Sequence, residues 1–156
     1  MMKEVIEELL SGREYSWIPE NSPAAIIVEL KDLRFFMESL YSHKALFFDV
    51  LSCVTGIDNG PEEGTMEVVY NLCSIPHERS LMVHVFCDRE KPVVPTMSDI
   101  WRTADWLERE TYDLLGIQFE HHPDQRRILL PADWEGFPLR KDYKEQEYYH
   151  GIRVAY

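Results

Sequence analysis

The sequence lacks any long hydrophobic run. Its longest uninterrupted apolar stretch, residues 24–28, is far shorter than the roughly 20 residues that a helix needs to cross a bilayer. The first residues, Met-Met-Lys-Glu, also lack the apolar core and small-residue cleavage site of a secretory signal. We therefore expect a cytosolic protein with no direct membrane span, which reaches a membrane only through another protein.

Cysteine is also scarce. Cys53, Cys73 and Cys87 are odd in number and widely spaced, so they form neither a disulfide framework nor a CxxC metal site. Each falls in a strand-like segment, where a free cysteine behaves as a small core residue. Too few thiolates lie close together for this chain alone to hold an iron–sulfur cluster.

Basic residues are outnumbered. The 16 lysines and arginines face 28 aspartates and glutamates, and the net charge of −12 opposes binding to nucleic acid and to anionic lipid. A glycine-rich phosphate loop and a GxSxG turn are absent as well. The sequence therefore predicts that this chain neither binds NADH itself nor catalyses by a nucleophilic serine.

The 156 residues, 45% of them hydrophobic, suit one domain with a real core. Apolar residues at helical spacing predict helices at 3–11, 33–42 and 99–115, the last with Ser98 as N-cap and Gly116 at its end. Runs rich in branched residues predict strands at 24–30, 46–55, 66–73 and 80–87. Turn signals at 58–61 and 75–79 separate the last three strands, and the final two form a hairpin.

The order of these elements predicts an α+β fold. Both faces of strand 80–87 are mostly apolar, so we expect it to be central, with His84 as a satisfied interior residue. A linker at 92–95 precedes the last helix, and prolines interrupt every pattern after Ile117. We predict two layers, with helices packed on one mixed β-sheet over residues 1–120 and an extended partner-binding tail over 121–156.

Charged residues gather near the end of the last predicted helix. Asp105, Arg109 and Asp113 share one helical face, so Arg109 can pair with a neighbouring carboxylate. Carboxylates at a helix C-terminus are disfavoured by the helix dipole, so a cation should compensate them. We expect Arg126 and Arg127 to do so for Glu108, Glu110 and Asp113, or a neighbouring protein's arginines to replace them; a solvated helix end is the alternative.

The tail combines prolines with tryptophan, tyrosine and arginine. Tryptophan and arginine dominate the energetics of protein interfaces, because each covers a large area and arginine donates in a rigid fork. Such a segment is typical of one that orders against a partner. The predicted interface residues are Glu108, Arg109, Glu110, Asp113, His122, Pro123, Asp124, Arg126, Arg127, Asp133, Trp134, Pro138, Leu139, Arg140, Lys141, Asp142 and Tyr143.

These motifs also follow one another in a familiar order. Glu-Arg-Glu-Thr-Tyr-Asp at 108–113 precedes Gly-Ile-Gln-Phe at 116–119, His-Pro-Asp at 122–124, Arg-Arg-Ile-Leu at 126–129 and Asp-Trp-Glu-Gly-Phe-Pro-Leu-Arg-Lys-Asp-Tyr at 133–143. Together they resemble the signature of the C subunit of respiratory complex I. His121 and Gln125 depart from it, because the family usually has a small residue and leucine there.

The resemblance implies a non-catalytic scaffold in the peripheral arm of a proton-translocating NADH:quinone oxidoreductase. The complex uses FMN, iron–sulfur clusters, NADH and quinone, none of which this scaffold itself holds. The resemblance places the tail along the quinone-pocket (D) subunit, beside the terminal-cluster (B) subunit, on the cytoplasmic side of the cell inner membrane. Holding neighbours in register would support electron transfer from NADH to quinone.

Other functions remain open at this stage. Related membrane-bound hydrogenase-type complexes contain an equivalent subunit. A metal-dependent enzyme could use His121, His122 and Asp124, although neighbouring histidines in an extended loop point different ways and catalytic zinc needs convergent ligands. A hydrolase using Glu108 and Glu110 is weaker, because residues two apart on a helix point about 200° away from each other.

Overall fold

The computed structural model describes residues 2–154. Its helices are α1 (Met2–Leu9), α2 (Leu30–Ser42) and α3 (Ala104–Leu115). Its strands are β1 (Tyr15–Ile18), β2 (Ala24–Val28), β3 (Val50–Gly60), β4 (Thr65–Ser74), β5 (Arg79–Asp88), β6 (Val93–Pro95), β7 (Gln118–Glu120), β8 (Tyr148–Tyr149) and β9 (Ile152–Arg153). The predicted α+β class is confirmed.

One mixed sheet of five strands forms the framework, in the order β1-β2-β5-β4-β3. The pairs are antiparallel except that β2 and β5 run parallel. The predicted central strand is confirmed as β5, and β4 and β5 form the predicted hairpin. Alternation along β5 turns Leu81, Val83 and Val85 into the core.

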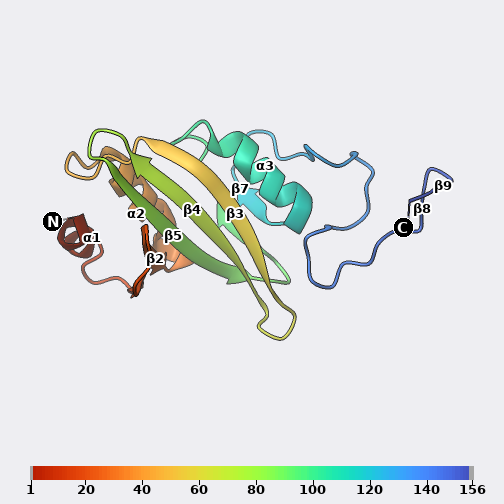
Figure 1. The fold of residues 1–156 in the computed structure, drawn as a ribbon, viewed down its shortest axis with the longest axis horizontal. Coiled ribbons are helices and arrows are strands. Elements are labelled where there is room, and N and C mark those ends of the chain that lie inside the picture. The colour runs from red at the N-terminus through yellow and green to blue at the C-terminus, as the bar shows by residue number, and fades with distance from the viewer. Residues whose placement is uncertain (1, 155–156) are drawn as a thin grey trace.

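The helices form the second layer, with α2 behind the sheet in Figure 1. The buried stripe of α2 consists of Leu33, Phe36, Met37 and Leu40. Helix α3 packs on β3, and this contact is close because Gly56 has no side chain. A Cβ at Gly56 would lie 2.4 Å from Cδ1 of Leu115. The two-layer arrangement is therefore as expected.

Two predicted boundaries are wrong at β3. The strand begins at Val50 rather than 46, because Leu46 and Phe48 lie in hydrogen-bonded turns that follow α2 and bury both side chains in the core. It also continues to Gly60 through a β-bulge, so the connection to β4 falls at 61–64 instead of 58–61.

The region before α3 also differs from the prediction. The helix begins at Ala104, because Ile100 and Trp101 form a turn on the carbonyl of Met97. Ser98 is therefore no helix cap, and its hydroxyl accepts a bond from Thr96 instead. The expected linker at 92–95 contains strand β6, which pairs with β7 in a small parallel sheet that the sequence pattern did not reveal. The end of α3 at Gly116, in the left-handed conformation, is confirmed.

The tail follows β7. Between Glu120 and Tyr148 the chain forms no helix or strand, and it extends past one end of the sheet to the short β8–β9 hairpin (Figure 1). The division into a core at 1–120 and a tail at 121–156 stays a prediction, and residues 1, 155 and 156 lie outside the described part. Within that part, no helix combines the length and apolarity that spanning a bilayer requires.

Candidate subunit interface

The start of the tail is attached to helix α3 by one buried carboxylate. Oδ2 of Asp113 accepts the backbone N–H groups of Ile128, Leu129 and Leu130 at 3.0, 2.7 and 2.9 Å. Its Oδ1 accepts Nη1 of Arg127 at 2.8 Å. Burial alone would raise the pKa of Asp113, but these donors together lower it below its ordinary value. Asp113 therefore replaces the regular backbone partners that this stretch lacks.

Arg127 extends the attachment into the tail. Its Nη2 donates to the carbonyls of Trp134 and Gly136, both at 2.9 Å, and its guanidinium lies over the ring of Phe137 at 5.1 Å. The predicted pairing of a tail arginine with the acidic end of α3 is thus confirmed for Arg127 and Asp113. Arg127, near the start of the tail, therefore connects helix α3 to the tail backbone at Trp134 and Gly136.

The same prediction is wrong for Arg126. Its side chain is 72% exposed and pairs with Asp124 at 3.0 Å, while Glu110 on the helix is exposed. Arg109 also departs from the helical-face prediction, since it donates to the carbonyls of Arg126 and Arg127 at 3.2 and 3.3 Å. The side chain of Asp113 meets the backbone and Arg127 instead, as described above.

Glu108 was expected to meet a tail arginine, but it lies inside the protein. The side chain is fully buried, and it accepts the hydroxyl of Thr96 at 2.5 Å and the N–H of Met97 at 2.7 Å. Glu108 and Asp113 are five residues apart, which places them about 140° apart around the helix. The two carboxylates therefore face different segments: Glu108 faces the segment before α3, and Asp113 faces the tail.

A second attachment, which sequence reasoning missed, holds the far part of the tail. Arg89 and Asp58 form a buried pair between the ends of β5 and β3, with N···O distances of 2.7 and 3.0 Å. Asp142 bonds to Arg89 at 2.7 Å, and the N–H of Lys141 bonds to Asp58 at 2.8 Å. The bonds from Arg89 and these backbone donors hold the pKa of Asp58 well below its ordinary value.

The middle of the tail follows the C-terminal end of α3. Leu139 and Arg140 donate to the carbonyls of Leu114 and Leu115 at 3.0 and 2.7 Å, which satisfies two groups that a helix end leaves open. Phe137 lies against Gly116, where a Cβ would come within 2.6 Å of its ring. This contact requires glycine for its space as well as for its φ of +77°.

The remaining predicted residues have separate environments. Trp134 donates to the hydroxyl of Tyr143 at 3.2 Å, and Asp133 accepts bonds from Tyr149 and His150 in the terminal hairpin. Pro138 is half-buried, Pro123 is exposed at the edge of a pocket, and His122 is buried against α3. Most of the predicted interface residues therefore form hydrogen bonds or packing contacts within the chain.

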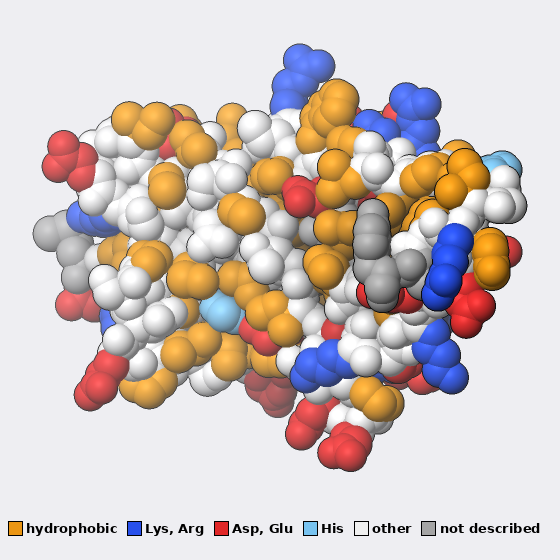
Figure 2. Space-filling model, turned by 45° about the vertical axis from the view of Figure 1, so that its right-hand side comes forward, with side chains coloured by type: hydrophobic (Ala, Val, Ile, Leu, Met, Phe, Trp, Pro, Cys, Tyr) orange, Lys and Arg blue, Asp and Glu red, His pale blue; other side chains and the backbone are white. Residues whose placement is uncertain are grey.

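A smaller set remains exposed beside these contacts. Trp106 is 63% exposed and Leu129 is 62% exposed, although both are large apolar side chains. Arg109 connects Trp106 to the start of the tail, because its guanidinium lies 5.2 Å from the Trp106 ring and donates to the backbone carbonyls of Arg126 and Arg127. We call Trp106, Arg126 and Leu129 the docking strip. Figure 2 shows hydrophobic side chains exposed among lysines and arginines at the tail end of the molecule.

The proposed metal ligands do not converge. The side chain of His121 is 85% exposed, and Asp124 pairs with Arg126. Both ring nitrogens of His122 already have polar partners within the chain. Within residues 2–154, no group of three or more histidine, cysteine, aspartate or glutamate side chains is placed to hold a metal ion. The geometry gives no support to the metal-dependent alternative.

Comparison with known proteins identifies the family. The model of the family "Respiratory-chain NADH dehydrogenase, 30 Kd subunit" matches residues 26–149. The chain belongs to this family. The NADH-quinone oxidoreductase C subunit of Chloroherpeton thalassium is 52% identical over 125 residues, which are 80% of this chain and 50% of that protein. The chain thus spans about half the length of this family member.

Solved structures of similar fold agree with the family assignment. The trypsin-resistant fragment (1–134) of Nqo5 is 31% identical, with a TM-score of 0.64 over 79% of this chain and 98% of the fragment. A chain of the membrane-bound sulfane sulfur reductase, an archaeal respiratory membrane complex, has a TM-score of 0.75 over 92% of this chain and 85% of its own. At 24% identity, the second match shows the shared fold alone. The resemblance that the tail motifs suggested is confirmed at the level of the family.

Proposed function

We propose that this chain is a non-catalytic scaffold subunit in the peripheral arm of an NADH:quinone oxidoreductase. In this proposal the arm transfers electrons from NADH through FMN and iron–sulfur clusters to quinone, and the chain holds none of these groups. It contacts the quinone-pocket subunit and the terminal-cluster subunit on the cytoplasmic side of the membrane. Membership of the family and the identity to the Chloroherpeton protein support the assignment.

The observation that supports the proposal is the exposed docking strip, which combines Trp106 of α3 with Arg126 and Leu129 of a tail that is fixed by hydrogen bonds within the chain. Asp113 and Arg127 hold the backbone from 127 to 130, so Leu129 is presented in one position. A preordered surface loses less conformational entropy on binding than a mobile one. Exposed tryptophan and arginine are the residues that contribute most at interfaces.

The predicted set of interface residues is therefore reduced, and Trp106, which the prediction did not include, is added to it. Three polar side chains form hydrogen bonds within the chain, and we assign them to positioning the tail: Arg127, Arg140 and Asp142. Trp106, Arg126, Leu129 and Leu139 keep large exposed areas, and we assign them to the contact with a partner. Since Arg126 is the exposed cation of the strip, the partner surface should place a carboxylate opposite it.

An equivalent role in a related hydrogenase-type complex is the second candidate. The observation behind it is that a chain of another respiratory membrane complex, the sulfane sulfur reductase, has the same fold. The higher identity to a protein of NADH-quinone oxidoreductase favours the first candidate. The cofactors of the co-purified complex discriminate, because FMN with NADH-dependent quinone reduction supports the first and a nickel-containing hydrogenase supports the second.

The test is co-purification of the tagged full chain from its own cells, followed by mass spectrometry of its partners. We expect the other peripheral-arm subunits in equal amounts. Trp106→Ala combined with Arg126→Glu should reduce their recovery at least tenfold. The control is Ile75→Ala, since Ile75 is 68% exposed in the β4–β5 turn, outside the strip. Equal recovery with both variants would contradict the proposed surface.

A further inference from the structure

One face of the five-stranded sheet carries no helix in the described part of the chain. The three helices pack on the other face, where Ile6 of α1, Leu40 of α2 and Leu115 of α3 share one core with Val83 of β5. Figure 1 shows α2 behind the sheet, with β4 and β5 uncovered at the front. Parallel strands normally have both faces covered, and β2 and β5 run parallel. The front of this pair therefore lacks the layer that parallel strands normally have.

The uncovered face is largely apolar. Alternation along β5 turns Met82 and Phe86 away from the core, and the strand register places side chains of β2, β3 and β4 beside them. Phe86 and Ile57 are 39% and 40% exposed, although both are large apolar side chains. Contiguous exposed apolar surface of this kind marks sites of protein interaction. We call the following set the open face: Ile27, Ile57, Val69, Met82 and Phe86.

The two polar side chains at the centre of the open face bind each other. Nδ1 of His84 lies 2.5 Å from Oε1 of Glu67, and the two side chains are only 12% and 13% exposed. Apolar side chains of the adjacent strands flank both of them in the strand register. A protein that covers the open face therefore meets no unpaired charge, which would be costly to remove from water.

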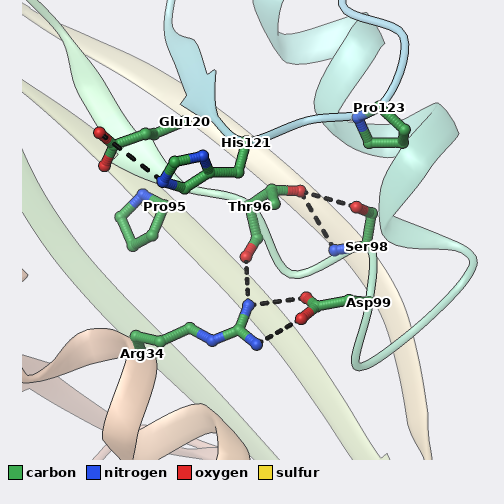
Figure 3. A pocket seen from close by; sticks show the side chains of 8 residues that line it. All are labelled: Arg34, Pro95, Thr96, Ser98, Asp99, Glu120, His121 and Pro123. Atoms are coloured by element: carbon green, nitrogen blue, oxygen red, sulfur yellow. Dashed lines mark hydrogen bonds and ion pairs between the residues drawn. The ribbon is translucent and has the colours of Figure 1, made fainter.

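The helix side of the molecule has a different chemistry. In the pocket between α2 and the start of the tail, Arg34 donates to Asp99 and to the carbonyl of Thr96 (Figure 3). The docking strip lies on this side as well, because Trp106 belongs to α3, which packs on the core face of β3. The helix side is thus polar around an exposed tryptophan, whereas the open face is apolar. The two sides of the sheet suit different partner surfaces.

Charged side chains surround one end of the open face. Asp88 follows Phe86 by two residues, so it lies on the same face of β5. Acidic residues outnumber basic ones at this end, in the β3–β4 turn, after β5 and in the nearby tail: Glu62, Glu63, Asp88 and Glu90 against Lys91 and Lys141. The whole chain has a net charge of −12, so a second copy would bring like charge to this face. A surface with lysine or arginine beside an apolar centre would instead be attracted.

We propose that the open face is a second docking surface, which binds a different protein from the one on the docking strip. Its occupant presents apolar side chains with lysine or arginine at one edge, and it is not a second copy of this chain. The inference rests on the proposed scaffold function, because a scaffold that holds two neighbours in register needs two separate surfaces. The open face and the docking strip lie on opposite sides of the sheet, so both can be occupied at once.

The experiment is site-specific photo-crosslinking in the complex purified from the protein's own cells. In three versions of the full chain, p-benzoylphenylalanine replaces Phe86 of the open face, Trp106 of the docking strip or Phe35 of α2. Phe35 is the matched control, because it is 42% exposed and lies on the helix side. We expect crosslinks from position 86 to one protein, from position 106 to another, and from position 35 to none. The peptide crosslinked from position 86 should be apolar with lysine or arginine beside it.

Two variants test the chemistry of the occupant. Phe86→Lys places a cation on the open face and should lower recovery of the protein crosslinked from position 86 at least tenfold. Recovery of the protein crosslinked from position 106 should not change. Glu62→Lys combined with Glu63→Lys reverses the charge at the acidic end and should lower recovery of the same occupant at least threefold. Phe35→Lys should behave as the wild type; if Phe86→Lys does not fold, the crosslinks and the glutamate variant still decide.

Several outcomes would overturn the inference. They are a complex that crosslinks from position 106 but not from 86, a crosslink from 86 to a second copy of this chain, and a crosslink from 86 to the protein that 106 reaches. Unchanged recovery with a folded Phe86→Lys would also overturn it. A crosslink from 86 without one from 106 would contradict the docking strip alone, and crosslinks from neither position would count against the proposed function as well.

Discussion

The carboxylate of Asp58 and the guanidinium of Arg89 meet at two points, with Nε to Oδ1 at 2.7 Å and Nη2 to Oδ2 at 3.0 Å. Both side chains are almost fully buried. Asp142 and the backbone of Lys141 bind to this pair from the tail. The far part of the tail therefore depends on an ion pair that belongs to the core.

Acid should release this part of the tail. The pKa of Asp58 is lowered in the folded state, so between that pKa and the ordinary value near 4 the unfolded chain binds more protons. The stability contributed by Asp58 is therefore present above about pH 4 and is lost as the pH falls below it. Asp113, whose pKa is also lowered, acts in the same direction.

Asp58→Asn tests this dependence. It should lower the free energy of unfolding at pH 7 by about 3 kcal/mol, because it leaves Arg89 buried without its main partner. Its difference from wild type should shrink as the pH falls from about 4 toward about 2, because the carboxyl of Asp58 then becomes protonated in the unfolded wild-type chain and the folded state loses that advantage. Urea unfolding at a series of pH values measures both; a difference that is constant with pH would contradict the account.

Arg127 and Arg126 form a matched pair of neighbours. Arg127→Ala should cost about 3 kcal/mol of stability, because the buried Asp113 loses its cation. Arg126→Ala should change stability by less than about 0.5 kcal/mol, because its side chain is exposed. Chemical unfolding gives both values, and limited proteolysis should show cleavage between 127 and 136 in the first variant alone. Equal decreases in the free energy of unfolding in the two variants would rule out that Arg127 stabilises the buried carboxylate of Asp113.

Gly116 and Gly64 separate backbone strain from steric contact. Both have positive φ, +77° and +64°, so replacement by alanine costs about 1 kcal/mol of strain at either position. At Gly64 the added Cβ meets nothing within 4 Å, whereas at Gly116 it lies 2.6 Å from the ring of Phe137. Gly116→Ala should therefore be at least about 1 kcal/mol more destabilising than Gly64→Ala in thermal unfolding. Similar costs would show that Phe137 moves away freely.

Buried Glu108 gives the opposite pH dependence from Asp58. Its pKa is raised to about 7, so its contribution to stability is complete below about pH 4.5 and is lost as the pH rises through about 7. Glu108→Gln keeps the neutral shape, so it should match wild type near pH 5 and exceed it near pH 8.5 by at most about 3 kcal/mol. Thermal unfolding of both proteins at these pH values is the measurement. If the wild type instead became more stable than Glu108→Gln as the pH rises, the argument that burial raises the pKa of Glu108 would be contradicted.

Local signals in the sequence were sufficient for part of this structure. Gly116 ends α3 because it adopts positive φ without strain, and the apolar alternation of β5 identified the central strand. The pairing of Asp113 with Arg127 followed from the unfavourable position of a carboxylate at a helix end. Each of these three features depends on residues that are close to one another in the sequence.

Contacts between distant residues were not predictable in this way. Asp58 and Arg89 are brought together by strand pairing, and nothing local in either segment indicates the other. His84 was expected to be satisfied, yet only its Nδ1 is bonded, to Glu67, and its buried Nε2 lacks a partner within the described residues.

The burial of Glu108 did leave a signal. It shares a helical face with Ala104, Thr111 and Leu115, all of them buried against the core. The separation of about 200° between Glu108 and Glu110 follows from the sequence, and the same helical projection of α3 also separates Glu108 from Asp113 by about 140°. The expectation that Arg126 and Arg127 compensate all three carboxylates is therefore wrong for Glu108, which faces the core.

The central claim is that the docking strip is covered by another protein of the complex. Hydroxyl-radical footprinting of the chain alone and of the purified complex measures this directly, because the indole of Trp106 and the side chain of Leu129 are both exposed and oxidisable. We predict at least fivefold protection of both residues in the complex, with Ile75 oxidised equally in the two samples. Oxidation of Trp106 and Leu129 at the same rate in the chain and in the complex would contradict the account.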